Sequence, residues 1–190
     1  MATDINTRRK NWQTGYELAK KHIDQFDTAL DIGCDIFGWS NLMTQDFAHV
    51  HAFDFRDRTE FLNNKKIQFH QVGLGEATTT RYTKRGVGRI KANETATKTC
   101  DMPVKITTVD SFDFTNVGLI KVDCDGYEKL VLQGAKQLLT QQSPVIFCEL
   151  HTSDTNSSHD YLLSLGYSHE ETWYDDHGIA HDAVYIRDKK

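Results

Sequence analysis

The amino-acid sequence predicts an α/β fold of three layers with a mostly parallel central sheet. Two observations lead to this prediction. Apolar runs of strand length alternate with segments of helical periodicity from Ala29 to Leu165. Polar residues also gather where several of these runs end, and ligands of open parallel sheets bind at the carboxyl ends of the strands. The chain has 190 residues and no internal repeat, which suits a single domain over residues 1–190.

The stretch 119–151 shows the pattern most clearly. Its first strand ends at Asp123, a helix follows, and its second strand ends in Glu149 and His151. A short helical crossover places two such strands side by side, so the three polar residues are expected to meet at one edge of the sheet. Alternation along the second strand places Glu149 and His151 on the same side.

The remaining elements follow from the same patterns. Strands are expected at 29–32, 50–53, 67–72, 104–109, 119–122, 145–148, 168–174 and 183–187. Helices are expected at 12–23, after Gly38 as far as Phe47, at 127–138 and at 161–165. Other segments are expected to be loose or irregular, namely the polar residues 1–10, the inserted basic loop 76–103, and residues 152–160 as a flap outside the core.

A glycine turn after the first strand predicts a nucleotide site. Asp31 precedes the turn at Gly33, and Asp54 ends the next strand, 21 residues after Gly33. In dinucleotide sites an acidic residue at this sequence spacing accepts hydrogen bonds from the two hydroxyls of a ribose. The phosphate-binding G-x-G-x-x-G is absent, and the charge of Asp35 would repel a pyrophosphate. An adenosine ligand with a cationic end fits better, and S-adenosylmethionine is the common one.

For Asp31 and His151, a purely structural role is an alternative to a role in the site. Asp31 faces the ammonium group of the cofactor or ties down the next turn, and His151 is a general base or a structural residue at a strand end. Asp123 and Glu149 are the other candidates for the base. The remaining predicted cofactor contacts are Gly38, Trp39, Ser40, Phe55, Gln71, Gly73, Leu74 and again Asp123.

These residues resemble the FkbM-type methyltransferases. The resemblance rests on D-I-G at 31–33, A-F-D at 52–54, I-K-V-D-C-D-G-Y-E at 120–128 and F-C-E-L-H at 147–151. It implies a Rossmann-like class I methyltransferase domain with seven strands, the last one antiparallel, and methyl transfer from S-adenosylmethionine to an oxygen of a sugar or another small polar acceptor. The chain departs from the family pattern at Phe37, where the second glycine usually stands, and at Asp35 in place of asparagine.

Composition excludes several other classes. No apolar run reaches the length of a membrane span, and the start of the chain lacks the apolar core of a signal peptide. The four cysteines show no paired spacing, which favours free thiols in the cytoplasm. Three of them lie near strand ends with His151, but small buried thiols are a better interpretation than a zinc site, and we expect no metal.

The charge of −5 is uneven. Residues 81–98 carry six basic side chains against Glu94, a local charge of +5. This basic loop either attracts an anionic acceptor or is a solvated hairpin around Gly86–Gly88. Aromatic residues are too few there for a nucleic-acid platform. Two further function classes stay open, a nicotinamide-dependent oxidoreductase and a non-catalytic binding protein. The acceptor's identity and the oligomeric state cannot be read from the sequence.

Overall fold

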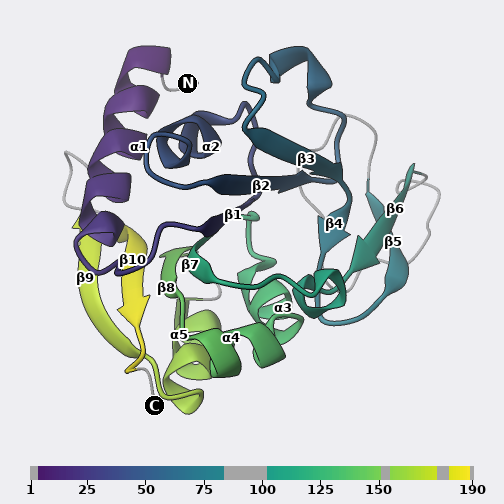
Figure 1. The fold of residues 1–190 in the computed structure, drawn as a ribbon. Helices are drawn as coiled ribbons and strands as arrows, with labels where there is room; N and C mark the ends of the chain where they lie inside the picture. Colours follow the sequence, from purple (N-terminus) through teal and green to yellow (C-terminus); the bar gives the residue numbers. More distant parts are fainter. Residues whose placement is uncertain (1–3, 84–101, 151–154, 175–179, 189–190) are drawn as a thin grey trace.

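A seven-stranded sheet forms the centre of the computed structural model, which describes residues 4–83, 102–150, 155–174 and 180–188 (Figure 1). Its strand order is β3-β2-β1-β7-β8-β10-β9. The first five of these run parallel, and β10 is antiparallel to both of its neighbours. The strands of this sheet are β1 (Thr28–Ile32), β2 (His49–Asp54), β3 (Ile67–Gln71), β7 (Val117–Val122), β8 (Val145–Glu149), β9 (Ser168–Tyr174) and β10 (Ala180–Ile186). The prediction of a mostly parallel seven-stranded sheet whose last strand is antiparallel is confirmed.

Helices pack on both faces of this sheet and complete the three layers. In Figure 1, α1 and α2 lie on one face, and α3, α4 and α5 lie on the other. The helices are α1 (Ile5–Lys20), α2 (Gly38–Met43), α3 (Glu128–Gln133), α4 (Lys136–Gln142) and α5 (Thr155–Ser164), with single turns η1 (Thr59–Phe61) and η2 (Val109–Phe112). Among the described residues, none of these helices combines the length and apolar character that crossing a membrane needs.

Burial explains why the central strands read as continuous apolar runs. Every residue of β1 and β7 is buried, as expected for parallel strands covered on both faces. The core is divided by the sheet into two clusters, one beneath α3, α4 and α5 and one beneath α1 and α2. Trp12 of α1 packs against the second cluster and contacts Gly38, so it is a packing residue.

A second, smaller sheet was not expected from the sequence. It contains β4 (Gly73–Leu74), β5 (Thr79–Thr83) and β6 (Met102–Thr107) in the order β4-β6-β5. The predicted cofactor contacts Gly73 and Leu74 form a short strand, because they pair with the end of β6. The hairpin predicted around Gly86–Gly88 lies outside the described residues, although β5 and β6 on either side of that segment pair antiparallel.

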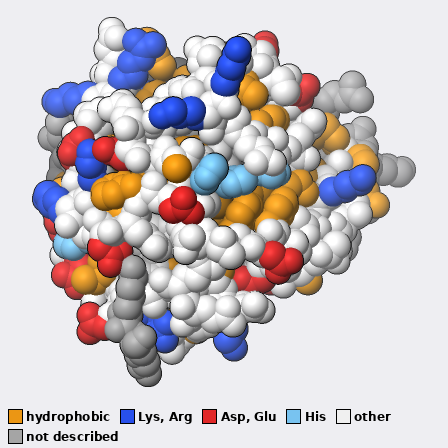
Figure 2. Space-filling model, in the orientation of Figure 1, with side chains coloured by type: hydrophobic (Ala, Val, Ile, Leu, Met, Phe, Trp, Pro, Cys, Tyr) orange, Lys and Arg blue, Asp and Glu red, His pale blue; other side chains and the backbone are white. Residues whose placement is uncertain are grey.

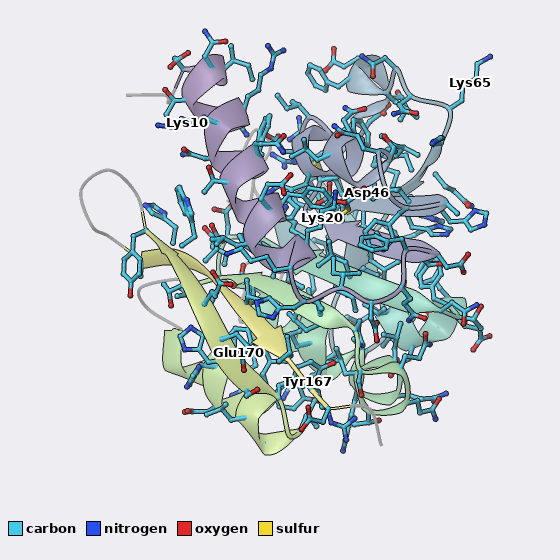
Figure 3. The ribbon with its side chains drawn as sticks, turned by 60° about the vertical axis from the view of Figure 1, so that its left-hand side comes forward. Lys10, Lys20, Asp46, Lys65, Tyr167 and Glu170 are labelled. Atoms are coloured by element: carbon cyan, nitrogen blue, oxygen red, sulfur yellow. The ribbon has the colours of Figure 1, made fainter. Side chains whose placement is uncertain are left out.

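Helix α1 begins earlier than predicted. Residues 5–10 were expected to be loose, but Asp4 caps the helix by accepting hydrogen bonds from the backbone N–H groups of Asn6 and Thr7. At its other end, Lys20 donates to Asp46 over 2.8 Å, and Figure 3 shows the two side chains side by side. The helix α1 is therefore fixed to the segment that follows α2. Helix α2 itself ends at Met43 and does not reach Phe47 as predicted.

The single helix predicted over 127–138 is divided into α3 and α4. At the break, Gly134 packs so closely on the carbonyl oxygen of Gly75 that a Cβ would collide with it. Asp110 then caps α4, because its carboxylate accepts from the backbone N–H groups of Gln137 and Leu138 at 2.9 and 3.0 Å. Both contacts come from distant parts of the chain, so helical periodicity does not reveal the break.

The predicted flap 152–160 overlaps a helix instead. Helix α5 begins at Thr155, and Ser158 within it is buried, so this part of the segment belongs to the packed domain. Residues 151–154 lie outside the described chain.

Histidine side chains gather beside a hydrophobic patch on the face shown in Figure 2. Among the described residues, His51 on β2 and His70 on β3 approach each other with Nδ1 and Nε2 3.0 Å apart. The rings of Phe53, Phe112 and Phe114 pack against this pair at centroid distances of 4.6 to 5.3 Å. The residues after β6 thus supply aromatic cover to this part of the sheet.

Candidate functional site

A cavity of about 290 Å³ opens at the carboxyl ends of β1, β2 and β7. It lies where the strand order reverses, since β2 and β3 extend on one side of β1 and β7 lies on the other. Ligands of open α/β sheets bind at such a switch point. The lining residues are Arg8, Ile32, Gly33, Asp35, Phe53, Asp54, Phe55, Arg56, Val72, Gly73, Leu74, Asp123, Cys124, Asp125 and Tyr127.

The glycine turn forms one wall of the cavity. Gly33 has φ +80°, and a Cβ there would collide with the backbone carbonyl oxygen of Asp123. Only glycine therefore lets the turn approach the end of β7 so closely. The backbone N–H groups of Gly33 and Cys34 both donate to the carbonyl oxygen of Phe53 at 3.0 Å, which also fixes the turn to β2.

Asp54 is held by arginines. Its side chain is 2% exposed, and it accepts from the backbone N–H of Arg56 at 2.8 Å. The guanidinium of Arg56 donates from Nε to Oδ1 at 2.9 Å and from Nη2 to Oδ2 at 2.8 Å. Arg58 adds a longer contact from Nε to Oδ2 at 3.4 Å. Asp54 thus presents both carboxylate oxygens to paired donors at the cavity wall.

Asp35 is also balanced by arginines. Arg8 of α1 donates to it at 2.7 Å, and Arg58 lies 2.9 Å away. Burial by itself would raise the pKa of the Asp35 carboxyl, but the bond from Arg8 and the charges of Arg58 and Arg56 outweigh it and lower the pKa. Asp35 is therefore an anion whose charge is shared with neighbouring arginines, which weaken its predicted repulsion of a pyrophosphate.

A buried lysine joins the glycine turn to the end of β7. Lys121 is 3% exposed and donates from Nζ to the carbonyl oxygen of Gly33 at 2.8 Å. The same nitrogen lies 3.3 Å from Asp31 Oδ1 and 3.3 Å from Asp123 Oδ2. Burial opposes the charged form, but Asp123 and Asp31 outweigh it and raise the pKa of Lys121. Lys121 is thus a charged link between the three groups.

Three carboxylic acids meet beside the cavity at the ends of β7, β8 and β10. Glu149 pairs in register with Asp182, and both are close enough to Asp123 to feel its charge. Burial and the charge of Asp123 raise the pKa of Glu149 to about 9 and that of Asp182 to about 8. Glu149 Oε2 is buried and has no hydrogen-bond partner among the described atoms, which also favours the neutral form. Glu149 can therefore hold a proton at neutral pH.

The structure brings together only part of the predicted site. Seven of the predicted cofactor contacts line the cavity, namely Gly33, Asp35, Asp54, Phe55, Gly73, Leu74 and Asp123. Gln71 does not line it, and Glu149 lies beside it. His151 falls outside the described residues, so its predicted role as a base stays a prediction.

Asp31 and the residues after Gly38 lie behind the turn instead. Asp31 is fully buried, and its Oδ2 accepts from the backbone N–H and the hydroxyl of Ser40 at 2.9 and 2.5 Å. This geometry matches the alternative in which Asp31 ties down the next turn. Trp39 packs between Tyr16 and Phe147 in the core, and neither it nor Gly38 lines the cavity.

Several lining residues were not predicted as contacts, and three of them have polar side chains that the site uses: Arg8, Arg56 and Tyr127. Arg8 belongs to a helix turn that was expected to be loose, and Arg56 follows Asp54 without a recognisable motif. Tyr127 was treated only as part of a helix face, although its ring lies against Gly75 beside the cavity. Glu128 has a structural role behind this wall, because it accepts from the backbone N–H groups of Cys124 and Gly126 at 2.7 and 3.1 Å.

Comparison with known proteins shows which family model and which solved structures resemble this chain. The family model of the methyltransferase FkbM domain matches residues 40–169. A methyltransferase FkbM from Methylobacillus flagellatus KT is similar in structure, with a TM-score of 0.63 and 17% identity; the match covers 85% of this chain and 43% of that one. The chain thus spans less than half the length of this relative. No curated protein sequence matches the chain.

Two other solved structures share the fold over nearly their whole length. An rRNA methylase from Streptococcus thermophilus has a TM-score of 0.58 and 9% identity, over 93% of this chain and 95% of that one. A Streptococcus mutans protein solved in complex with SAH has a TM-score of 0.53 and 10% identity, over 91% of this chain and 94% of that one. At these identities the likeness concerns the fold alone.

Proposed function

The chain belongs to the FkbM methyltransferase family, and from this premise we propose that it binds S-adenosylmethionine in the cavity and methylates an oxygen of a sugar or another small polar acceptor. The observation that carries the proposal is Asp54. Its two carboxylate oxygens lie at the cavity wall and already accept two parallel donors from one planar group. A ribose presents a similar pair of donors through its neighbouring hydroxyls.

The rest of the cavity suits the other parts of the cofactor. Gly73, Leu74 and Phe55 offer an apolar border for the adenine, and the glycine turn leaves room for close approach to the backbone. Asp123 and Asp125 place carboxylates where a ligand with a sulfonium and an ammonium group would be stabilised. When bound, the cofactor supplies a methyl group already activated by the sulfonium, so the protein mainly orients the reactants and excludes water.

The acceptor is proposed to bind beside Asp123, Glu149 and His151. Asp123 is 48% exposed and lies 3.3 Å from the ammonium of Lys121, so it can accept a hydrogen bond from the acceptor hydroxyl. Glu149 can take the acceptor's proton only after losing its own, because its pKa is raised to about 9. His151 is the alternative base, since an imidazole titrates near neutral pH.

A thermal-shift screen tests this proposal at the level of ligand class. The protein is heated alone and with S-adenosylmethionine, S-adenosylhomocysteine or NAD, each at the same concentration. A ligand that binds only the native state raises the midpoint of unfolding. We expect the two adenosyl ligands to raise it and NAD to leave it unchanged. Stabilisation by NAD alone would support an oxidoreductase, and no shift with any of the three would contradict the proposal.

Once binding of the cofactor has been observed, methyl transfer by the same protein is measured. Labelled S-adenosylmethionine is incubated with hydroxyl acceptors of neutral and anionic sugar classes, and transfer of label is followed. Binding without transfer to any acceptor would favour the non-catalytic alternative. Glu149→Gln serves as the matched variant, because it removes the titratable group while keeping the size of the side chain.

A further inference from the structure

Arg56 occupies the two oxygens that the proposed cofactor needs. Its Nε and Nη2 donate to Oδ1 and Oδ2 of Asp54 at 2.9 and 2.8 Å. Such a two-point contact between a guanidinium fork and a carboxylate is among the strongest side-chain pairings. It also matches the geometry of a ribose, whose two neighbouring hydroxyls would donate to the same two oxygens. Arg56 and the ribose therefore cannot both hold Asp54 in this way.

A second carboxylate is available to receive the displaced guanidinium. Arg56 Nη2 lies 3.8 Å from Asp35 Oδ1, so the group is already close to this alternative partner. The Arg56 side chain is 33% exposed at the cavity wall, and a rotation about its bonds can carry the guanidinium from one acid to the other. Arg58 contacts both acids, and it remains to balance Asp54 after Arg56 has left.

We propose that Arg56 is an internal ligand of Asp54 that competes with the cofactor ribose and moves to Asp35 when the cofactor binds. The inference rests on the proposed function. Arg56 thereby sets the affinity of the site, because each binding event exchanges the Arg56–Asp54 contact for the ribose–Asp54 contact. The effect is the same for substrate and product forms of the cofactor, since both carry the same ribose.

The energetic consequence has a definite sign. Removing Arg56 abolishes the competing contact, so the cofactor no longer has to displace it. In the wild type, the cofactor must break the Arg56–Asp54 hydrogen bonds, which are strong because both groups are charged. The net cost is smaller than their full energy, because Arg56 forms a new contact with Asp35 and because solvent weakens the exposed pair. We expect Arg56→Ala to bind S-adenosylhomocysteine about 5- to 30-fold more tightly than the wild type. A residue that merely supported Asp54 would give the opposite result.

Isothermal titration calorimetry with S-adenosylhomocysteine tests the inference. The proteins are wild type, Arg56→Ala, Arg56→Lys and the control Arg9→Ala, which removes an exposed arginine of α1 outside the cavity lining. Arg56→Lys keeps the charge but cannot donate as a planar fork, so its affinity should fall between the other two. Arg9→Ala should match the wild type. Arg56→Lys also keeps the test open if Arg56→Ala fails to fold.

Thermal unfolding of the same proteins provides a second measurement. Arg56→Ala leaves Asp54 with a weaker partner, so it should melt at a lower temperature than the wild type without ligand and show a larger rise with S-adenosylhomocysteine. If the wild type binds S-adenosylhomocysteine and both Arg56 variants bind it with the same or lower affinity, the inference about Arg56 is overturned and the proposed function is not. Absence of binding by all four proteins would overturn the proposed function, and the inference with it.

Discussion

At the residue scale, the carboxylates around the cavity differ in the cations that they face. Asp35 and Asp54 are paired with arginines, and Asp123 lies beside Lys121. Glu149 has burial and like charges instead, which raise its pKa. The site therefore contains acids that face cations and two acids, Glu149 and Asp182, whose pKa is raised by burial and by the charge of Asp123. The sequence reveals these acids through their places at strand ends, but their partners Arg8 and Arg56 come from segments without a motif.

Asp54 provides the first prediction at this scale. Asp54→Ala, made in an Arg56→Ala background so that no internal ligand competes, should weaken binding of S-adenosylhomocysteine by about 1–3 kcal/mol, because hydrogen bonds from the ribose to a charged acceptor are lost. Calorimetric affinity is the measurement, and circular dichroism checks that the variant is folded. Asp57→Ala is a suitable control, since this exposed acid bonds only locally to Thr59. An unchanged affinity in a folded Asp54→Ala protein would contradict the ribose assignment.

Glu149 provides the second prediction, on the pH dependence of stability. Its pKa is raised by burial from 4.5 to about 9 in the fold, so between these values the native state binds the proton that the unfolded state has released. The stabilisation by the neutral form is complete below about pH 4.5 and is lost as the pH rises toward 9. Glu149→Gln removes this dependence. As the pH rises, the free energy of unfolding of the variant should therefore increase relative to that of the wild type by up to ~1.4 kcal/mol per pH unit.

The measurement for Glu149 is urea unfolding of both proteins between pH 5.5 and pH 8, about the window in which the protonation states differ. Asp182 is present in both proteins, so its own raised pKa contributes equally to the two curves. Parallel pH curves for wild type and variant would show that Glu149 is ionised in the fold.

At the element scale, the strands are readable from the sequence and the ends of the helices are not. Buried parallel strands such as β1 and β7 appear as apolar runs because both faces are covered. The division between α3 and α4 depends on Asp110 and Gly75, which come from other elements. Likewise, β4 exists because it pairs with β6, and no local pattern in Gly73–Leu74 indicates this.

Gly134 allows a prediction about this division. Its φ is −75°, so alanine is not excluded by backbone conformation, but a Cβ would collide with the carbonyl oxygen of Gly75. Gly134→Ala should therefore lower the free energy of unfolding by about 1–3 kcal/mol through overpacking. It should also weaken cofactor binding, because Gly75 follows the cavity residue Leu74.

Urea unfolding and calorimetry measure the two effects of Gly134→Ala. Lys136→Ala is the control, since this exposed residue at the start of α4 should change stability by less than about 0.5 kcal/mol. A Gly134→Ala protein as stable as the control would show that α3 and the strand β4 can separate without cost.

At the scale of the whole molecule, the uneven charge predicts where the acceptor enters. Of the basic segment 81–98, Arg81 lies in β5 and pairs with Glu76 at 2.8 Å, and the other five basic residues lie outside the described chain. Strand β6, which follows the segment, pairs with β4, whose residues line the cavity. Charge reversal of Arg85 and Arg89 should raise the Michaelis constant of an anionic acceptor severalfold, more at low salt, and leave cofactor affinity unchanged.

The control for this charge reversal is the pair Lys10→Glu and Lys65→Glu, which alters the net charge equally. Figure 3 shows both lysines pointing outward at the edges of the molecule, away from each other. Steady-state kinetics at two salt concentrations separate the cases. If both pairs of substitutions raised the Michaelis constant alike, the effect would belong to the net charge and the basic segment would have no special place at the acceptor entrance.

The central claim is that the cavity at the ends of β1, β2 and β7 holds S-adenosylmethionine. A crystal structure with S-adenosylhomocysteine tests it most directly. We predict that the ribose hydroxyls lie within hydrogen-bond distance of Asp54, that the adenine borders Gly73 and Leu74, and that Arg56 has moved toward Asp35. A complex with the ligand bound elsewhere, or with its ribose away from Asp54, would contradict the account.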